Sequence, residues 1–150
     1  GVFLASRAVI PLMRKAGGGS IINISSNWGK VGFPDASAYC ASKAGVVAYC
    51  ESLRGELRGS GVRVVTLLPG YIDTPLTRAN RYAMPFLMPA DRFAEWALRA
   101  IGQGVSYRVI PWQMAVVAKL LRVLPNALFD RLLSGRPRKA RAGPTTMPGP

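Results

Sequence analysis

The sequence predicts an α/β fold in which a parallel sheet is covered by helices on both faces. Segments with apolar residues at helical spacing alternate with short runs of β-branched residues, in the order helix, strand, helix, strand, helix, strand, helix. Such alternation requires crossover connections, which place helices on the two faces of a parallel sheet. The chain has 150 residues, of which 49% are hydrophobic and 18% charged, a composition typical of one globular domain.

The first two elements are a helix and a strand. Residues 1–15 repeat apolar side chains at helical spacing, and Gly17–Gly19 end this helix in a turn. Residues 20–26 then predict a strand. Its β-branched run is of the kind buried in parallel sheets, and it consists of Ile21, Ile22 and Ile24.

A loop from 27 to 36 leads to a long helix predicted over residues 37–59. Ser37 is a plausible cap for its first turn, and Gly61 provides a stop after its last turn. Three further elements follow after this helix: a strand at 62–68, a helix at about 90–101 and a strand at 107–110.

The remaining residues form an amphipathic extension and a basic tail. We expect one domain over 1–112, a helical extension over 113–134 with Pro125 opening its second piece, and a disordered tail over 135–150. Residues 113–141 either pack on the domain or a partner subunit, or contact a membrane peripherally. The predicted apolar face of the first helix consists of Met114, Val117, Leu120, Leu121 and Leu124.

Composition excludes several classes of protein. No apolar run reaches the roughly 18 residues of a membrane span. The chain has no histidine, and Cys40 and Cys50 lie too far apart along one predicted helix to form a disulfide. We therefore expect buried free thiols, no metal site and a cytoplasmic location, with peripheral membrane contact as an open addition. The net charge of +13 is partly concentrated in a tail without interleaved aromatic residues, so no nucleic acid is expected as a partner.

Candidate catalytic residues cluster at the end of the first strand and near the start of the helix that follows it. Ser25 and Ser26 end the first strand, and in a parallel sheet ligands bind beyond the carboxyl ends of the strands. Tyr39 and Lys43 are four residues apart on the helix that follows, so both side chains point from one face. An ammonium group beside a phenol favours the phenolate, which makes Tyr39 usable as a general acid and base.

The segments NISSNWG, YCASK and LLPGYIDTP together resemble the short-chain dehydrogenase/reductase family, over about residues 1–112. The family pattern has a serine thirteen residues before the tyrosine of Tyr-x-x-x-Lys, and that serine is Ser26. The resemblance implies a Rossmann-like, three-layer fold, of which this chain represents the C-terminal half.

The resemblance also implies roles for these residues. Tyr39 exchanges a proton with the substrate oxygen, Ser26 orients the carbonyl group, and Lys43 assists Tyr39 and binds the nicotinamide ribose. The implied cofactor is NAD or NADP. The choice between the two stays open, because the segment that selects between them is missing from this chain. The implied cofactor contacts are Tyr39, Lys43, Pro69, Gly70, Ile72 and Thr74.

The sequence departs from the family at its beginning. The glycine-rich phosphate loop, the Asn-Asn-Ala-Gly motif and the asparagine of the catalytic tetrad are all absent, and the chain opens at Gly1 without a methionine. We therefore expect a fragment that neither binds cofactor nor catalyses alone. In the complete protein we expect a homodimer or homotetramer, joined by helices 1–15 and 37–59 as in the family.

The predicted function is interconversion of an alcohol and a ketone or aldehyde. Residues 76–89 stand where the family has a variable lid, and their apolar character suggests a hydrophobic substrate or packing on the core. Two alternatives remain open. One is a sugar-nucleotide epimerase or dehydratase of the same family, and the other is a non-enzymatic basic module that binds lipid or nucleic acid.

Overall fold

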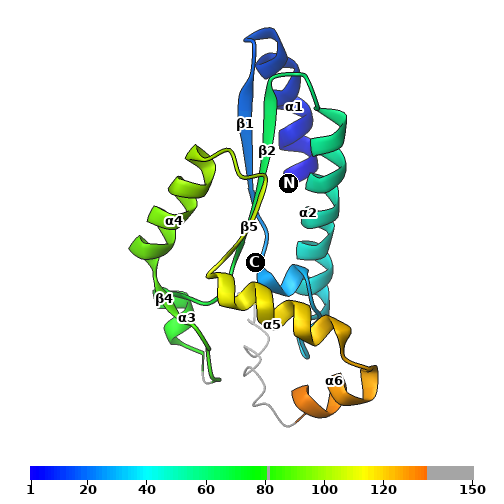
Figure 1. Ribbon diagram of the computed structural model, residues 1–150, viewed down its shortest axis with the longest axis vertical. Helices are drawn as coiled ribbons and strands as arrows, with labels where there is room; N and C mark the ends of the chain where they lie inside the picture. Colours follow the sequence, from blue (N-terminus) through cyan, green and yellow to red (C-terminus); the bar gives the residue numbers. More distant parts are fainter. Residues whose placement is uncertain (81, 135–150) are drawn as a thin grey trace, which may run out of the picture.

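The protein is built around a three-stranded parallel sheet, shown in Figure 1 by a computed structural model that describes residues 1–80 and 82–134. The strands are β1 (Gly19–Ile24), β2 (Val62–Pro69) and β5 (Tyr107–Ile110), in the order β1-β2-β5. Ile21 pairs with Val64 across the first ladder, and Leu68 pairs with Val109 across the second.

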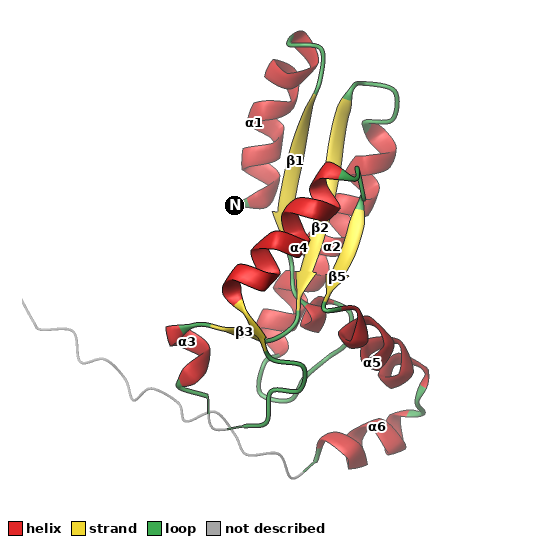
Figure 2. Cartoon of the chain, turned by 60° about the vertical axis from the view of Figure 1, so that its left-hand side comes forward, coloured by secondary structure: helices red, strands yellow, loops and turns green. Residues whose placement is uncertain are grey.

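Helices lie on both faces of this sheet. Figures 1 and 2 show α1 (Val2–Lys15) and α2 (Ser37–Glu56) on one face and α4 (Ala90–Gly102) on the other. Two short strands, β3 (Ile72–Asp73) and β4 (Met88–Pro89), form a separate parallel pair, with α3 (Pro75–Arg78) between them in the chain. The C-terminal helices are α5 (Trp112–Val123) and α6 (Asn126–Leu133), and a 3-10 helix, η1 (Asn27–Gly29), follows β1.

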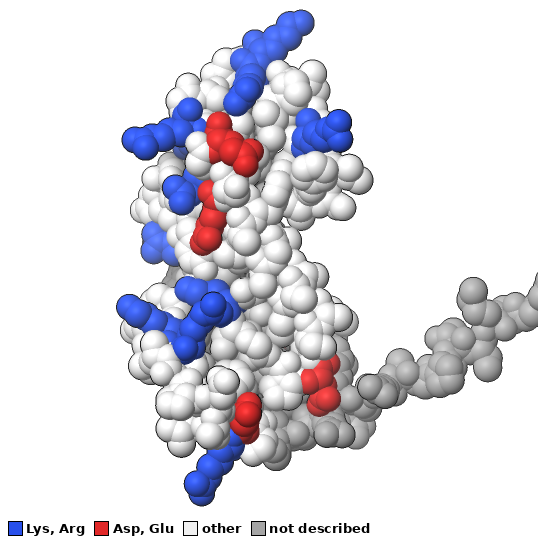
Figure 3. Space-filling view, turned by 90° about the vertical axis from the view of Figure 1, so that its right-hand side faces the viewer, with Lys and Arg blue, Asp and Glu red and all other residues white. Residues whose placement is uncertain are grey.

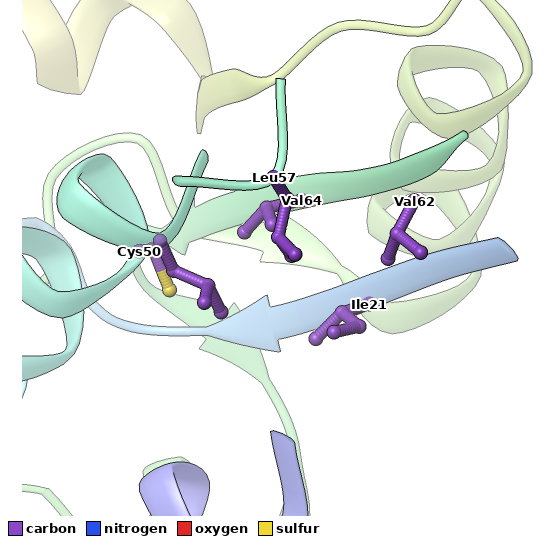
Figure 4. Packing of buried hydrophobic residues seen from close by; sticks show 6 residues of the cluster. Ile21, Cys50, Leu57, Val62 and Val64 are labelled. Carbon is purple, nitrogen blue, oxygen red and sulfur yellow. The ribbon is translucent and has the colours of Figure 1, made fainter. Parts of the chain in front are cut away.

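The core sits on the two faces of β2, the central strand. Val64 points toward α2 and packs with Cys50 and Ile21, as Figure 4 shows. Val65 and Leu67, on the opposite face, pack against α4. Successive side chains of a strand point to opposite faces, so a strand with helices on both sides is apolar at nearly every position. This is why the sequence VRVVTLL reads as an almost continuous apolar run.

A third apolar cluster closes the carboxyl end of the sheet. Leu68 and Val109, from β2 and β5, pack with Tyr71 and with Met114 of α5. Trp28 of η1 packs against the same cluster. Buried apolar side chains therefore lie at the carboxyl end of the sheet, which is the end at which parallel α/β folds bind ligands.

The three-stranded parallel sheet and its helices confirm the predicted Rossmann-like α/β fold, and both cysteines are buried free thiols, as expected. Two predictions about the long helix are wrong. Ser37 is its first helical residue rather than its cap, because Ala36 is the cap residue and no side chain accepts a hydrogen bond there. The helix also ends at Glu56, since the backbone already departs from helical geometry at Leu57, four residues before Gly61.

Strand β1 is buried on one face only. Ile21 faces α2 and is buried, whereas Ile22 and Ile24 are 43% and 47% exposed. These two side chains point to the face that α4 covers over β2 and β5 but not over β1 (Figure 2). Among the described residues, β1 pairs with β2 alone, so it forms an edge of the sheet.

The predicted apolar face of the C-terminal extension needs correction as well. Met114 is buried against the sheet end, as is Ala118 one turn later. Leu120, which was assigned to the same face as Met114, is 60% exposed. The helix therefore has two apolar sides, one buried and one exposed. The periodicity of the sequence could not separate them and placed Met114 and Leu120 on a single face. The predicted tail at 135–150 lies outside the described residues.

Candidate active site

The two serines after β1 take different positions. The Ser25 hydroxyl donates a hydrogen bond to the backbone carbonyl of Lys43 at 2.8 Å, which ties the strand end to α2. Ser26 begins η1, and its hydroxyl oxygen accepts a hydrogen bond from the backbone N–H of Trp28 at 3.2 Å. Ser26 lines the cavity described below, whereas Ser25 does not. Ser25 thus connects the end of the strand to α2, and of the two serines only Ser26 faces the cavity.

Tyr39 and Lys43 lie one turn apart near the start of α2. The Lys43 ammonium lies 5.8 Å from the centre of the Tyr39 ring and donates a hydrogen bond to the carbonyl of Ile24 at 3.1 Å. That carbonyl belongs to the last residue of β1, so the lysine is fixed against the strand that carries the serines. The Tyr39 side chain is 45% exposed and reaches the cavity.

Gly29 allows this part of the chain to come close to α2. A Cβ atom at Gly29 would lie 2.8 Å from the backbone oxygen of Lys43 and 2.9 Å from the Ser25 hydroxyl oxygen. No ordinary side chain fits these distances, so only glycine permits the close contact. Gly29 lies in the NISSNWG segment, and nothing in the local sequence pattern indicates this close contact.

A cavity of about 700 Å³ lies at the carboxyl end of the sheet, and it brings Ser26, Tyr39 and Gly70 together. Four other predicted site residues do not line it: Lys43, Pro69, Ile72 and Thr74. Lys43 lies one turn after Tyr39 on α2. The other three residues lie before and after Gly70 and Tyr71 along the chain, and these two do line the cavity.

Four aromatic rings form a closed circuit in the cavity wall. Trp28 lies 4.3 Å from Phe33 and 6.2 Å from Tyr71, measured between ring centroids. Tyr82 completes the circuit, at 6.4 Å from Phe33 and 6.1 Å from Tyr71. All four residues line the cavity. Rings in tilted and edge-on contact form a firm apolar surface, suited to holding an apolar group.

The segment after β2 is held by its own hydrogen bonds. The Gly70 N–H donates to the carbonyl of Ile110 at 2.7 Å, and a Cβ at Gly70 would lie 2.9 Å from Met114 Cγ. Thr74 caps α3 through its hydroxyl, which accepts from the Thr77 N–H at 3.3 Å. Gly70 thus permits α5 to pack closely against this turn.

The pKa values of two side chains outside the cavity, Asp73 and Tyr107, are shifted. The Arg78 guanidinium donates to the Asp73 carboxylate at 2.7 Å, and this hydrogen bond lowers the pKa of the Asp73 carboxyl group. Burial raises the pKa of Tyr107 to about 12, and the charge of Glu51 adds to this effect.

Sequence reasoning missed part of the cavity wall. Trp28 and Phe33 lie in the loop between the serines and Tyr39, and their aromatic character in a polar loop was the available signal. Asp35, also in the wall, has a φ of +62°, which is strained for a residue other than glycine. Phe129 and Leu133 of α6 come from the far end of the chain, and no local pattern connects them with the cavity.

Within 1–80 and 82–134, no group of three or more potential metal ligands comes together. In the same residues, no helix is long and apolar enough to cross a bilayer.

Comparison with known proteins agrees with this arrangement. A sequence model of the family described as short chain dehydrogenase matches residues 1–84. An uncharacterized oxidoreductase from Myxococcus xanthus is 42% identical over 82% of this chain and 49% of its own length. Human retinol dehydrogenase 16 is 38% identical over 92% of this chain and 44% of its own length.

Among solved structures, a short chain dehydrogenase from Burkholderia cenocepacia in complex with NADP superposes with a TM-score of 0.71 at 31% identity. The match covers 85% of this chain and 54% of that one. The chain spans about half the length of the curated relatives it matches. Matched family sequence over more than half of the chain, together with the parallel sheet, shows that this chain belongs to the short-chain dehydrogenase family of oxidoreductases.

Proposed function

We propose that this chain carries the catalytic side of an NAD(P)-dependent oxidoreductase that interconverts an apolar alcohol and the corresponding ketone or aldehyde. The observation that supports this most strongly is the cavity in which Ser26 and Tyr39 meet an aromatic wall. Polar groups able to handle a carbonyl oxygen face the cavity on one side, and apolar rings able to hold the rest of the substrate line another.

Each catalytic residue has one task. Tyr39 donates its phenolic proton to the substrate oxygen during reduction and takes it back during oxidation. The Ser26 hydroxyl donates a hydrogen bond to the same oxygen and so fixes the carbonyl group beside Tyr39. Lys43 places a positive charge 5.8 Å from the Tyr39 ring, which stabilises the phenolate that forms as the proton leaves.

The side chains also suit a nicotinamide cofactor. A lysine ammonium has three N–H donors, and the bond to Ile24 uses one of them, so Lys43 has donors left for a ribose hydroxyl. The segment from Pro69 to Thr74 follows the carboxyl end of β2, where parallel α/β folds bind nucleotides. When bound, the nicotinamide supplies or accepts the hydride.

The substrate class follows from the cavity wall. The circuit of Trp28, Phe33, Tyr71 and Tyr82 favours a bulky apolar group over a charged one. Asp130 also lines the cavity, and its carboxylate disfavours anionic substrates. The similarity to human retinol dehydrogenase 16 supports a hydrophobic alcohol as substrate.

The test is reduction of a panel of apolar ketones and aldehydes by the full-length protein with NADH and NADPH. Tyr39→Phe should lower kcat by about 100-fold to 10,000-fold, the usual contribution of a general acid. Cofactor affinity should stay within about threefold, because the phenol acts mainly on the substrate proton. A Tyr39→Phe protein that turns over near the normal rate would contradict the assignment.

We also propose that the protein associates through α1 and α2. Helix α1 exposes apolar side chains, including Phe3, Leu4 and Leu12. On α2, no atom lies within 4 Å of the position of a Cβ at Gly45, so a partner helix could approach closely there. Gly45→Arg should convert a dimer to a monomer in sedimentation analysis. Gly55→Arg, at an equally open glycine of the same helix, is the matched control and should leave association unchanged.

A further inference from the structure

The C-terminal helix α5 exposes a continuous apolar stripe. Its members recur at spacings of three and four residues, which places them along one line of the helix. They are 46% to 72% exposed and consist of Trp112, Val116, Leu120 and Val123. The opposite side of α5, with Met114 and Ala118, is the side buried against the domain. The stripe therefore does not contribute to packing of the helix on the described part of the chain.

The next helix adds to this exposed apolar surface. Leu128 and Leu132 of α6, one turn apart, are each more than half exposed. Phe129 and Leu133 of the same helix turn instead toward the cavity. Six exposed apolar side chains within 21 residues are unusual on a soluble surface and indicate an interaction site.

The surroundings of the stripe are basic. Lys119 lies beside Trp112 and Val123 around the α5 helix and is exposed, and α5 contains no acidic residue. Arg122 lies nearby, and its guanidinium donates a hydrogen bond to the carbonyl of Lys30 at 2.9 Å. The described residues 113–134 contain three basic residues and one acidic residue, in a chain of net charge +13. Basic side chains are spread along the face of the molecule shown in Figure 3.

We propose that α5 and α6 dock on the surface of an anionic lipid bilayer. An exposed apolar stripe with a tryptophan, flanked by Lys and Arg, is the pattern of a helix that lies in a membrane interface. Basic residues next to it gain free energy from anionic headgroups. A nucleic acid would interact with the basic side chains but would leave the apolar stripe exposed, because phosphate contacts dominate its affinity for proteins. This proposal does not depend on the reaction catalysed.

Vesicle binding tests the proposal. The full chain is titrated with vesicles of phosphatidylcholine containing phosphatidylglycerol, and with vesicles of phosphatidylcholine alone, and bound protein is separated by flotation. We expect saturable binding to the anionic vesicles that weakens with added salt. Leu120→Ser should weaken it about tenfold, and Lys119→Gln about fivefold. Leu98→Ser, at an equally exposed leucine of α4, is the matched control and should change nothing.

Four outcomes would overturn the proposal. The first is no binding to either vesicle. The second is equal weakening by Leu120→Ser and Leu98→Ser. In the third, binding survives Leu120→Ser but is lost on truncation after Ser134, which would assign it to the tail. In the fourth, Leu120→Ser dissociates an oligomer in sedimentation analysis while vesicle binding is unchanged, which would make the stripe a contact between copies of this chain. Circular dichroism melts of each variant exclude unfolding as the cause of any loss.

Discussion

The catalytic side and the substrate side of the cavity are built in different ways. On the catalytic side, hydrogen bonds join β1 and α2 directly, from Ser25 to the carbonyl of Lys43 and from Lys43 to the carbonyl of Ile24. On the substrate side, aromatic rings from separate loops touch one another, and α6 contributes from the end of the chain. Hydrogen bonds fix the catalytic groups to a narrow geometry, whereas ring contacts tolerate changes of shape. The two sides should therefore respond differently to substitution.

The largest expected effect is on the catalytic side. Lys43→Ala removes both the charge beside Tyr39 and the hydrogen bond to Ile24, so kcat/KM should fall by about 100-fold or more. Because Lys43 is also proposed to hold the nicotinamide ribose, the Kd of the cofactor should rise in the same variant. Steady-state kinetics and cofactor titration measure the two effects separately. An unchanged cofactor Kd would remove Lys43 from the proposed cofactor contacts.

The close contact of the catalytic loop with α2 offers a second test. Gly29→Ala places a Cβ against the backbone of Lys43 and should destabilise the fold by about 1–3 kcal/mol, the usual effect of overpacking. Gly32→Ala, in the same loop with open space around it, should leave stability within about 0.5 kcal/mol. Urea denaturation of both variants measures the difference. Equal stability of the two variants would show that the loop moves away at little cost.

On the substrate side, loss of one ring should alter selectivity rather than chemistry. Phe33→Ala should raise KM for bulky aromatic ketones about tenfold, an effect of about 1.4 kcal/mol, and leave kcat within about twofold. Phe86→Ala removes the same side chain from a half-exposed position that does not line the cavity, and it should change neither constant. A fall in kcat with unchanged KM in Phe33→Ala would place Phe33 with the catalytic groups.

The smallest expected effect appears only in alkali. Tyr107 packs against the apolar cluster at the carboxyl end of the sheet, and burial raises its pKa to about 12, above the value near 10 of an unfolded chain. Above pH 10 the unfolded chain loses this proton first, so the stability that Tyr107 contributes is lost as the pH rises from about 10 through 12. Melting curves across this range should show the loss, and Tyr107→Phe should reduce it. An identical alkaline profile for Tyr107→Phe would exclude this group as the cause.

The residues proposed to be catalytic could be selected from the sequence because they lie in short motifs. Ser26, Tyr39 and Lys43 belong to segments read directly from the chain, and the β-branched runs identified all three strands of the sheet. The alternation of these β-branched runs with helical segments also predicts that the sheet is parallel. What remains a proposal is the chemistry assigned to these positions.

The substrate side was not predictable in the same way. Phe33 and Tyr82 are 49 positions apart, and the contact between their rings depends on how two loops fold over the sheet end. The apolar residues of α5 were assigned to one face because both sides of the helix are apolar, and only tertiary packing distinguishes Met114 from Leu120.

The hydrogen bond from Arg122 to the carbonyl of Lys30 spans 92 positions of sequence and joins α5 to the loop that carries Trp28 and Phe33. Through this bond the loop in the cavity wall is attached to the C-terminal helices as well as to the motif that carries Ser26. Residues 112–134 therefore help to shape the cavity, through this bond and through the side chains of α6 that line it. Exchanging them between relatives would reshape the binding surface and leave Ser26, Tyr39 and Lys43 undisturbed, which is a physical route to new substrates within one family.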